Sequence, residues 1–383
     1  MTLRYMEISL LKTKTSKLQY FSLFTNLLYG KAIGITAGVV VRAVGADAWT
    51  SMLIAFLIGI IFIQLMAHLG SKFPELTMID YSKLLLGKWV SRFFSILLVI
   101  FFAFAYATSA NTLTLHIKQY LLPETPTIAI ILLYAALVFY GTSLGIEVIT
   151  RVSFIAFVLI ILFNIITIFG TIQDFQAMNL QPIFDKGIIE NLKAGIYSFG
   201  DLSFVILGLG IIYPILNKKN KAMSTTFWAS IFATFIVITW PFIETATLGA
   251  DVMKQFSVVC MQLIRGVQLT RYFPRSELIM INLFVWSIFV QSSLMLFCCI
   301  YTMKDIIKVK KEWHLSAPLT VLIALLTYLM VQDHNKFVEF LAYPWPQAAA
   351  ILSIGYPSLL FIISLIRKKK IGTNSLTKQE NVP

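Results

Sequence analysis

The chain has 383 residues, of which 58% are hydrophobic and 13% are charged, and its formal net charge is +13. Soluble proteins contain about 25% charged residues, so this composition excludes a soluble domain and indicates an integral membrane protein. Lys and Arg on the inner face of such a protein interact with anionic lipid. We therefore expect the positive charge to bind the lipid bilayer and not a nucleic acid.

Ten apolar runs follow one another along the chain. Each is long enough to cross the hydrocarbon core as a helix of about 20 residues, and none shows the period-two alternation of a barrel strand. The sequence therefore predicts an all-α polytopic membrane protein with ten transmembrane helices. Their expected bounds are 18–41, 48–69, 91–116, 127–144, 151–171, 193–216, 225–249, 278–303, 316–332 and 347–366.

The positive residues predict how the chain crosses the membrane. Cytoplasmic loops carry the excess of Lys and Arg, and most of the 31 such residues lie on one side if the N-terminus is inside. We therefore expect a cytoplasmic segment at 1–17, a membrane domain at 18–366 and a polar cytoplasmic tail at 371–383. With five helices in each half, inverted repeats are expected at about 18–171 and 193–366.

The first span carries glycines and a lysine in its middle. Gly30 and Gly34 loosen a helix, and Lys31 lies roughly 20 Å from the inner edge at about 1.5 Å per residue, which is too deep to reach water easily. A charge there costs about 2.5 to 3.5 kcal/mol, so it needs a partner. Lys31 either holds a ligand carboxylate or takes the place of a bound cation. Alternatively, Asp201 neutralises it, or it lies in a polar seam that locks spans 1 and 6.

The third span carries a polar stripe. Ala105, Tyr106, Ser109 and Thr112 recur at helical spacing, so they can face the interrupted first span. A helix hydroxyl can instead bond back to its own helix or join two helices, and Tyr106 can fill core space rather than gate a ligand. Both alternatives remain open at this stage.

The sixth span is predicted to be interrupted like the first. Gly195 and Gly200 loosen it, and Asp201 follows directly. Asp201 is interpreted as an acceptor for an ammonium group or for unwound backbone, or alternatively as a wet residue near the outer mouth. Phe199 beside it is expected either to gate a ligand or to fill the core. Interrupted spans at matching positions in two halves indicate a small-molecule site near the bilayer midplane.

The eighth span adds amide and hydroxyl groups at Gln291, Ser292 and Ser293. Ser292 and Ser293 are the weak candidates for a sodium site, and helix packing is the alternative role. The complete set of expected ligand-binding residues is Gly30, Lys31, Ala32, Ile33, Gly34, Thr36, Ala105, Tyr106, Ser109, Tyr197, Phe199, Gly200, Asp201, Ser203 and Gln291. No other metal and no cofactor is expected.

The remaining reactive residues predict no enzyme. The four histidines have no His-x-x-His spacing, and the sequence has neither a P-loop nor a serine elbow. Cys260, Cys298 and Cys299 form neither a disulfide framework nor a metal-binding spacing.

An ordered set of short motifs extends from the second span to the eighth. The motifs are Asp47-Ala48-Trp49, Phe73-Pro74-Glu75-Leu76, Leu86-Gly87-Lys88-Trp89, Gly145-Ile146-Glu147-Val148 with Arg151, Pro182, Tyr213-Pro214, and Arg275 with Glu277 before Trp286. Together they resemble the B subunit of spore-germination nutrient receptors, within the amino-acid/polyamine/organocation transporter superfamily. The resemblance implies a LeuT-like 5+5 fold with broken helices 1 and 6.

The resemblance also implies a function. The chain is expected to bind a small nutrient, such as an amino acid, near the bilayer midplane and to signal to partner subunits, a membrane protein with soluble domains and a lipoprotein. It implies a location in the spore inner membrane or the cell membrane. The chain departs from the family pattern in two places: no proline follows the first break before Arg42, and Gly208 stands where an acidic residue is common.

Two other functions remain open from the sequence. One is a proton- or sodium-coupled amino-acid transporter, although a fixed positive charge at Lys31 disfavours sodium. The other is an ion-release pore.

Overall fold

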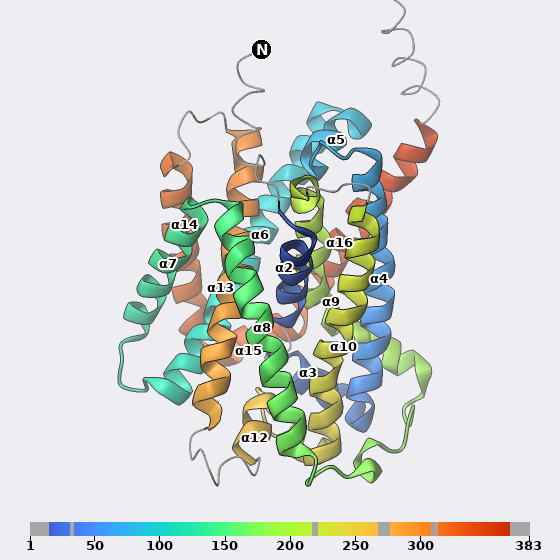
Figure 1. The fold of residues 1–383 in the computed structure, drawn as a ribbon, viewed down its shortest axis with the longest axis vertical. Coiled ribbons are helices and arrows are strands. Elements are labelled where there is room, and N and C mark those ends of the chain that lie inside the picture. The colour runs from blue at the N-terminus through green and yellow to red at the C-terminus, as the bar shows by residue number, and fades with distance from the viewer. Residues whose placement is uncertain are drawn as a thin grey trace, which may run out of the picture.

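The computed structural model describes residues 15–30, 34–216, 221–266, 276–307, 309 and 313–367. The side chains of residues 276, 277, 279 and 283 are not among the described parts. The described chain is a bundle of helices that run mostly along its long axis (Figure 1). Its regular elements are helices, which confirms the predicted all-α class.

The ten predicted spans correspond to eleven helices of this bundle, because the first span consists of two helices, α2 and α3. They are α2 (Lys17–Tyr29) followed by α3 (Thr36–Val44), then α4 (Ala48–Lys72), α6 (Lys88–His116), α7 (Thr127–Ser143), α8 (Ile146–Thr171), α9 (Gly187–Ile212), α10 (Ala222–Leu248), α13 (Ser276–Ile306), α14 (Trp313–Val331) and α16 (Pro344–Ile366). In the described residues, eight continuous helical stretches are long and apolar enough to cross a membrane, and α7 is an apolar helix one residue under that length.

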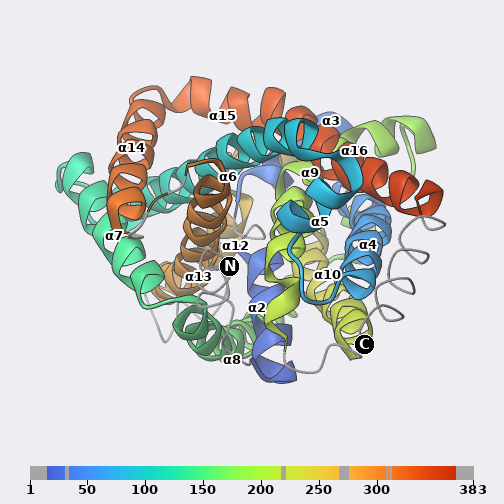
Figure 2. The same ribbon diagram turned by 90° about the horizontal axis from the view of Figure 1, so that it is seen from above.

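Short elements connect the longer helices. They are α5 (Met78–Leu86), α11 (Ala250–Met253), α12 (Val259–Gly266), α15 (His334–Ala342), and the turns η1 (Gly45–Asp47), η2 (Ile117–Leu121), η3 (Ala177–Leu180) and η4 (Tyr213–Ile215). Viewed from above, α15 lies across the bundle between α14 and α16 (Figure 2). The sequence predicted a loop at this position.

The predicted interruption of the first span is confirmed. Helix α2 ends at Tyr29, its C-cap Gly30 donates its backbone N–H to Asn26 O, and α3 begins at Thr36. Ile35, the N-cap of α3, provides no side-chain cap, so the first N–H groups of α3 are not satisfied by that residue. The two half-helices therefore present backbone groups at the break.

The predicted interruption of helix 6 requires correction, because α9 is continuous from Gly187 to Ile212. Its glycines permit close helix packing instead. A Cβ atom at Gly195 would lie 3.2 Å from Ala55 Cβ, and one at Gly200 would lie 3.1 Å from Trp345 Cδ1. Small residues let helices approach closely in lipid, where packing rather than hydrophobic burial drives association.

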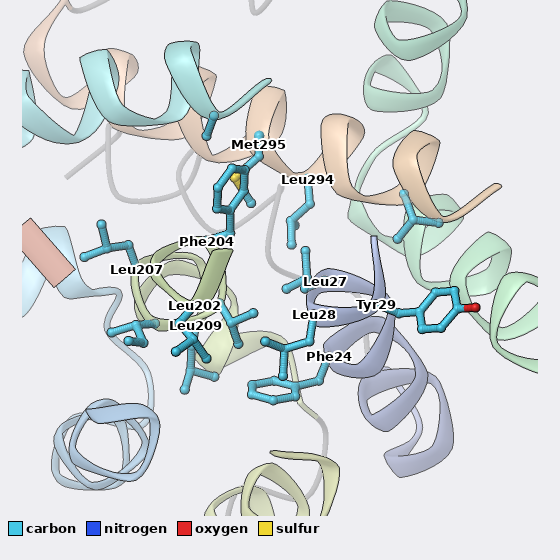
Figure 3. Close-up of a cluster of buried hydrophobic side chains, with 14 of the residues drawn as sticks. Phe24, Leu27, Leu28, Tyr29, Leu202, Phe204, Leu207, Leu209, Leu294 and Met295 are labelled. Atoms are coloured by element: carbon cyan, nitrogen blue, oxygen red, sulfur yellow. The ribbon is translucent and has the colours of Figure 1, made fainter. Parts of the chain in front are cut away.

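The core that fixes the break lies between α2, α9 and α13. In Figure 3, Phe24 and Leu28 of α2 lie toward Leu202 of α9, whereas Leu27 of α2 and Phe204 of α9 lie toward Leu294 and Met295 of α13. These side chains are almost fully buried. Helix α2, the first half of the broken helix, is therefore packed into the centre of the bundle.

Candidate functional site

A small cavity lies at the break of the first span. Its volume is about 30 Å³, and its lining residues are Gly30, Gly34, Ile35, Thr36, Thr112, Tyr197, Gly200, Asp201, Ile288, Leu341 and Trp345. Such a cavity has room for water, whereas ligand pockets typically enclose roughly 300 to 1,000 Å³. The described cavity is therefore too small for a ligand such as an amino acid.

Asp201 joins α9 to α3, the second half of the broken helix. Thr36, the first residue of α3, donates its hydroxyl to Asp201 Oδ2 over 2.7 Å. Asp201 is 9% exposed, so the carboxyl is buried rather than lying in a wet outer mouth. A helix N-terminus favours a negative group, and the N-terminal turn of α3 meets this carboxyl. The arrangement places a hydrogen-bond acceptor beside the N-terminal turn of α3.

Gln291 holds α2, the first half of the same broken helix. Its Nε2 donates to Leu27 O over 2.9 Å, and its Oε1 accepts from the Ser109 hydroxyl at 3.1 Å. A Cβ atom at Gly30 would lie 3.2 Å from this Oε1. The amide therefore links α6, α13 and the last turn of α2, and glycine at position 30 leaves room for it.

Asn26 adds a second link one turn earlier in α2. Its Nδ2 donates to Ser153 O of α8 at 2.8 Å, and its Oδ1 accepts from Ser287 of α13 at 2.9 Å. The end of α2 is thus bonded to α6, α8 and α13. Hydrogen bonds from three other helices therefore hold the end of α2 at the break.

Aromatic side chains close the other side of the cavity. The ring of Trp345 is stacked on Phe101 with centroids 5.4 Å apart, and the Tyr197 ring lies edge-on to Tyr343 at 5.9 Å. Trp345, Leu341 and Ile288 were not among the predicted site residues. The Pro344-Trp345-Pro346 sequence is the signal that could have indicated Trp345, because two prolines beside a tryptophan mark a special helix start.

A larger, open pocket lies next to the cavity. It has a volume of about 350 Å³ and is lined by Val39, Arg42, Ala43, Tyr197, Ser257, His334, Asn335, Val338, Glu339, Ala342 and Tyr343. We call this pocket the vestibule. Tyr197 lines both spaces, so this side chain stands between the vestibule and the cavity.

The predicted site residues divide into three groups. Gly30, Gly34, Thr36, Tyr197, Gly200 and Asp201 line the cavity. Six others are buried but lie outside its lining: Ala105, Tyr106, Ser109, Phe199, Ser203 and Gln291. Of these, Ser203 donates to Phe199 O and contacts the Ser353 hydroxyl of α16 at 2.9 Å. Lys31, Ala32 and Ile33 lie outside the described residues.

The two sodium candidates differ in their surroundings. Ser292 Oγ accepts from the Tyr134 hydroxyl at 2.8 Å, which joins α13 to α7. Ser293 Oγ is buried without a hydrogen-bond partner in the described part of the chain. Among the same residues, no group of three or more His, Cys, Asp or Glu side chains could hold a metal ion.

Comparisons with known sequences agree on one family. The family model described as spore germination protein matches residues 14–337. Spore germination protein KB of Bacillus subtilis (strain 168) is 22% identical over 370 residues, which cover 94% of this chain and 96% of that protein. Spore germination protein YndE of the same organism is 22% identical over 335 residues, with coverages of 84% and 88%.

A comparison with solved structures identifies the fold. The crystal structure of MhsT in complex with L-phenylalanine superposes with a TM-score of 0.61 at 13% identity, covering 89% of this chain and 94% of that one. At this identity the similarity establishes the fold alone. It confirms the LeuT-like transporter fold expected from the sequence.

Proposed function

The chain belongs to the spore germination protein family and is a multi-pass, permease-like membrane protein, and on this basis we propose that it is the nutrient-sensing subunit of a spore receptor. The observation that carries the proposal is the site at the break of the first span, where Thr36 and Asp201 meet beside an apolar wall. We place the protein in the spore inner membrane with both termini in the cytoplasm. Residues 1–17 and 371–383 are the proposed cytoplasmic segments.

The proposed ligand is a small zwitterion such as an amino acid. Its ammonium group would donate to Asp201, and its carboxylate would take backbone N–H groups at the start of α3, where a helix dipole favours an anion. Its side chain would lie against Trp345 and Ile288. Support comes from the neighbouring fold of MhsT, which was solved with L-phenylalanine.

Lys31 is proposed as the fixed cation of this site. The sequence places it directly after Gly30, at the break, where an isolated charge would be costly. It would hold either the ligand carboxylate or, without ligand, the carboxyl of Asp201. A Lys31→Met variant that responds to nutrient with normal dose dependence, at normal protein level, would remove Lys31 from the site.

The ligand would arrive through the vestibule. This pocket is large enough for a small molecule and contains both a cation, Arg42, and an anion, Glu339. Because the cavity behind Tyr197 holds only water-sized groups, binding requires α3 or Tyr197 to move. A ligand shifts such an equilibrium only by binding one conformation more tightly. The shift would be passed to the partner subunits, a membrane protein with soluble domains and a lipoprotein.

Ligand-protected thermal unfolding tests the proposal. Purified full-length chain is heated with each member of an amino-acid panel, and a ligand at 100 times its Kd should stabilise the protein by about 2.7 kcal/mol. Asp201→Asn should abolish this protection. Asp251→Asn, which changes an exposed carboxyl of α11, should preserve it. Protection that survives Asp201→Asn unchanged would exclude the proposed site.

A coupled transporter is the second candidate, because the fold is that of transporters. Uptake of labelled amino acid by proteoliposomes that contain this chain alone would favour transport. Binding without flux would favour sensing.

A further inference from the structure

A buried carboxyl that the proposed ligand site does not use lies near the end of α10. Glu244 is 1% exposed, and both of its carboxyl oxygens lack a hydrogen-bond partner among the described residues. Burial of an isolated carboxylate costs far more than burial of a neutral carboxyl, because the ion loses its hydration without compensation. Within the described residues, a proton bound to Glu244 would offset the cost of this burial.

Glu244 is linked to α12 through Cys260, and through Cys260 to groups of α2 and α8. Cys260 of α12 is the electrostatic neighbour of Glu244 and also of Tyr29, the last residue of α2. The Tyr29 hydroxyl accepts from Asn164 of α8 at 3.1 Å. Trp240, one turn before Glu244, lies beside the same hydroxyl. Glu244 thus belongs to a buried polar cluster that begins at the break of the first span.

Helix α12 covers this cluster. Val259, Cys260, Met261, Leu263 and Ile264 are all buried, so one face of this short helix packs onto the bundle. Elements α10 and α13 lie beneath it. Figure 1 shows α12 at the end of the molecule opposite α5. Displacement of α12 would therefore bring water to Glu244.

Helix α3, the second half of the broken helix, is bonded to the segment before α12. Arg42 of α3 donates to Phe256 O at 3.3 Å. A Cβ atom at Gly38 would lie 2.9 Å from both Phe256 O and Ser257 O, so α3 and this segment are in tight contact. Because of these contacts, a movement of α3 that opens the cavity would also displace the segment leading into α12.

We propose that Glu244 is a proton-binding site that holds its proton while α12 covers it and releases the proton to water when α3 and α12 move outward together. The step breaks the carboxyl O–H bond and leaves the carboxylate in contact with water. Outward opening is then coupled to the loss of one proton, so a rise in pH favours opening and a fall favours the closed state. The inference does not require the proposed nutrient.

Other ionisable groups near this end of α10 have different surroundings. Cys260 of α12, the electrostatic neighbour of Glu244, is buried. Asp251 of α11 is exposed and paired with Lys254 at 2.9 Å. Asp47, before α4, accepts from the backbone N–H groups of residues 184 and 185 at 2.7 and 3.0 Å, and η3 carries no charged residue. Glu244 is therefore distinguished by being both buried and without a hydrogen-bond partner in the described residues.

Modification of Cys260 by N-ethylmaleimide tests the proposal. Cys260 is 1% exposed, so its reaction reports displacement of α12. The full chain is allowed to react at a series of pH values from acidic to mildly alkaline. The rate of modification is then read from the peptide that carries Cys260. Division by the rate in the denatured chain at each pH removes the effect of thiol ionisation. The ratio should rise with pH, by at most about tenfold per pH unit for one released proton.

Variants and salt distinguish the outcomes. Glu244→Gln should abolish the pH dependence, and Asp251→Asn should preserve it. If the rate ratio of the unmodified chain does not change with pH, the proposal is wrong. The proposal is also wrong if the rate ratio of Glu244→Gln rises with pH as steeply as that of the unmodified chain. A ratio that depends on sodium or potassium concentration but not on pH also overturns it, because Glu244 would then bind a metal cation.

Discussion

The Thr36 hydroxyl donates to Asp201 Oδ2 over 2.7 Å, and this bond joins the first residue of α3 to the middle of α9. Asn26 and Gln291 connect the first half, α2, to three other helices. The break in the first span is thus fixed on one side by several bonds and on the other by contacts with α9 and with the segment before α12. We propose that α3 is the part of the site that moves, and that the Thr36–Asp201 bond resists this movement.

Replacement of Thr36 by Val should loosen α3. The variant keeps the shape of the side chain but removes the donor to Asp201, so the protein should lose about 1 kcal/mol of stability. Thr36→Ser keeps the hydroxyl and is the matched control. Thermal unfolding of both variants measures the difference. Equal loss in the two variants would mean that the methyl group, not the hydrogen bond, stabilises α3.

The continuity of α9 predicts opposite effects of alanine at two of its glycines. At Gly195 the added methyl group meets Ala55 and Ser51 at 3.2 Å, so Gly195→Ala should cost about 1 to 3 kcal/mol through overpacking. At Gly208 the nearest atom is 3.7 Å away, so Gly208→Ala should stabilise the helix by about 0.5 to 1 kcal/mol. Unfolding temperatures measure both effects. Stabilisation by both substitutions would contradict the close packing of α4 on α9.

Gln291 should be coupled energetically to Ser109. Gln291→Leu leaves the Leu27 carbonyl without its side-chain donor and the Ser109 hydroxyl without one acceptor, at an expected cost of about 1 to 3 kcal/mol. Ser109→Ala removes one bond of this link. A double-mutant cycle on thermal stability should give a smaller loss for the pair than the sum of the single losses. Strict additivity would show that the two side chains stabilise the fold independently.

The sequence predicted the first break correctly and the second incorrectly for a physical reason. Glycine in a helix either weakens it or admits a neighbour, and the sequence does not distinguish these roles without knowing which helix lies alongside. Gly30 adjoins a true break, whereas Gly195 accommodates Ala55. The position of Trp345 against Gly200 was equally inaccessible, because it depends on how α15 directs the chain into α16.

The position of Tyr197 between the vestibule and the cavity predicts a kinetic effect. Tyr197→Ala should speed both association and dissociation of a bound amino acid while changing its Kd little, because the side chain obstructs the path in both directions. Asn335→Ala is the control, since Asn335 lines the vestibule and not the cavity. Stopped-flow fluorescence, with Trp345→Phe to identify the signal from the cavity, measures the rates. If Tyr197→Ala weakens binding with unchanged association, Tyr197 contacts the ligand instead of controlling its access.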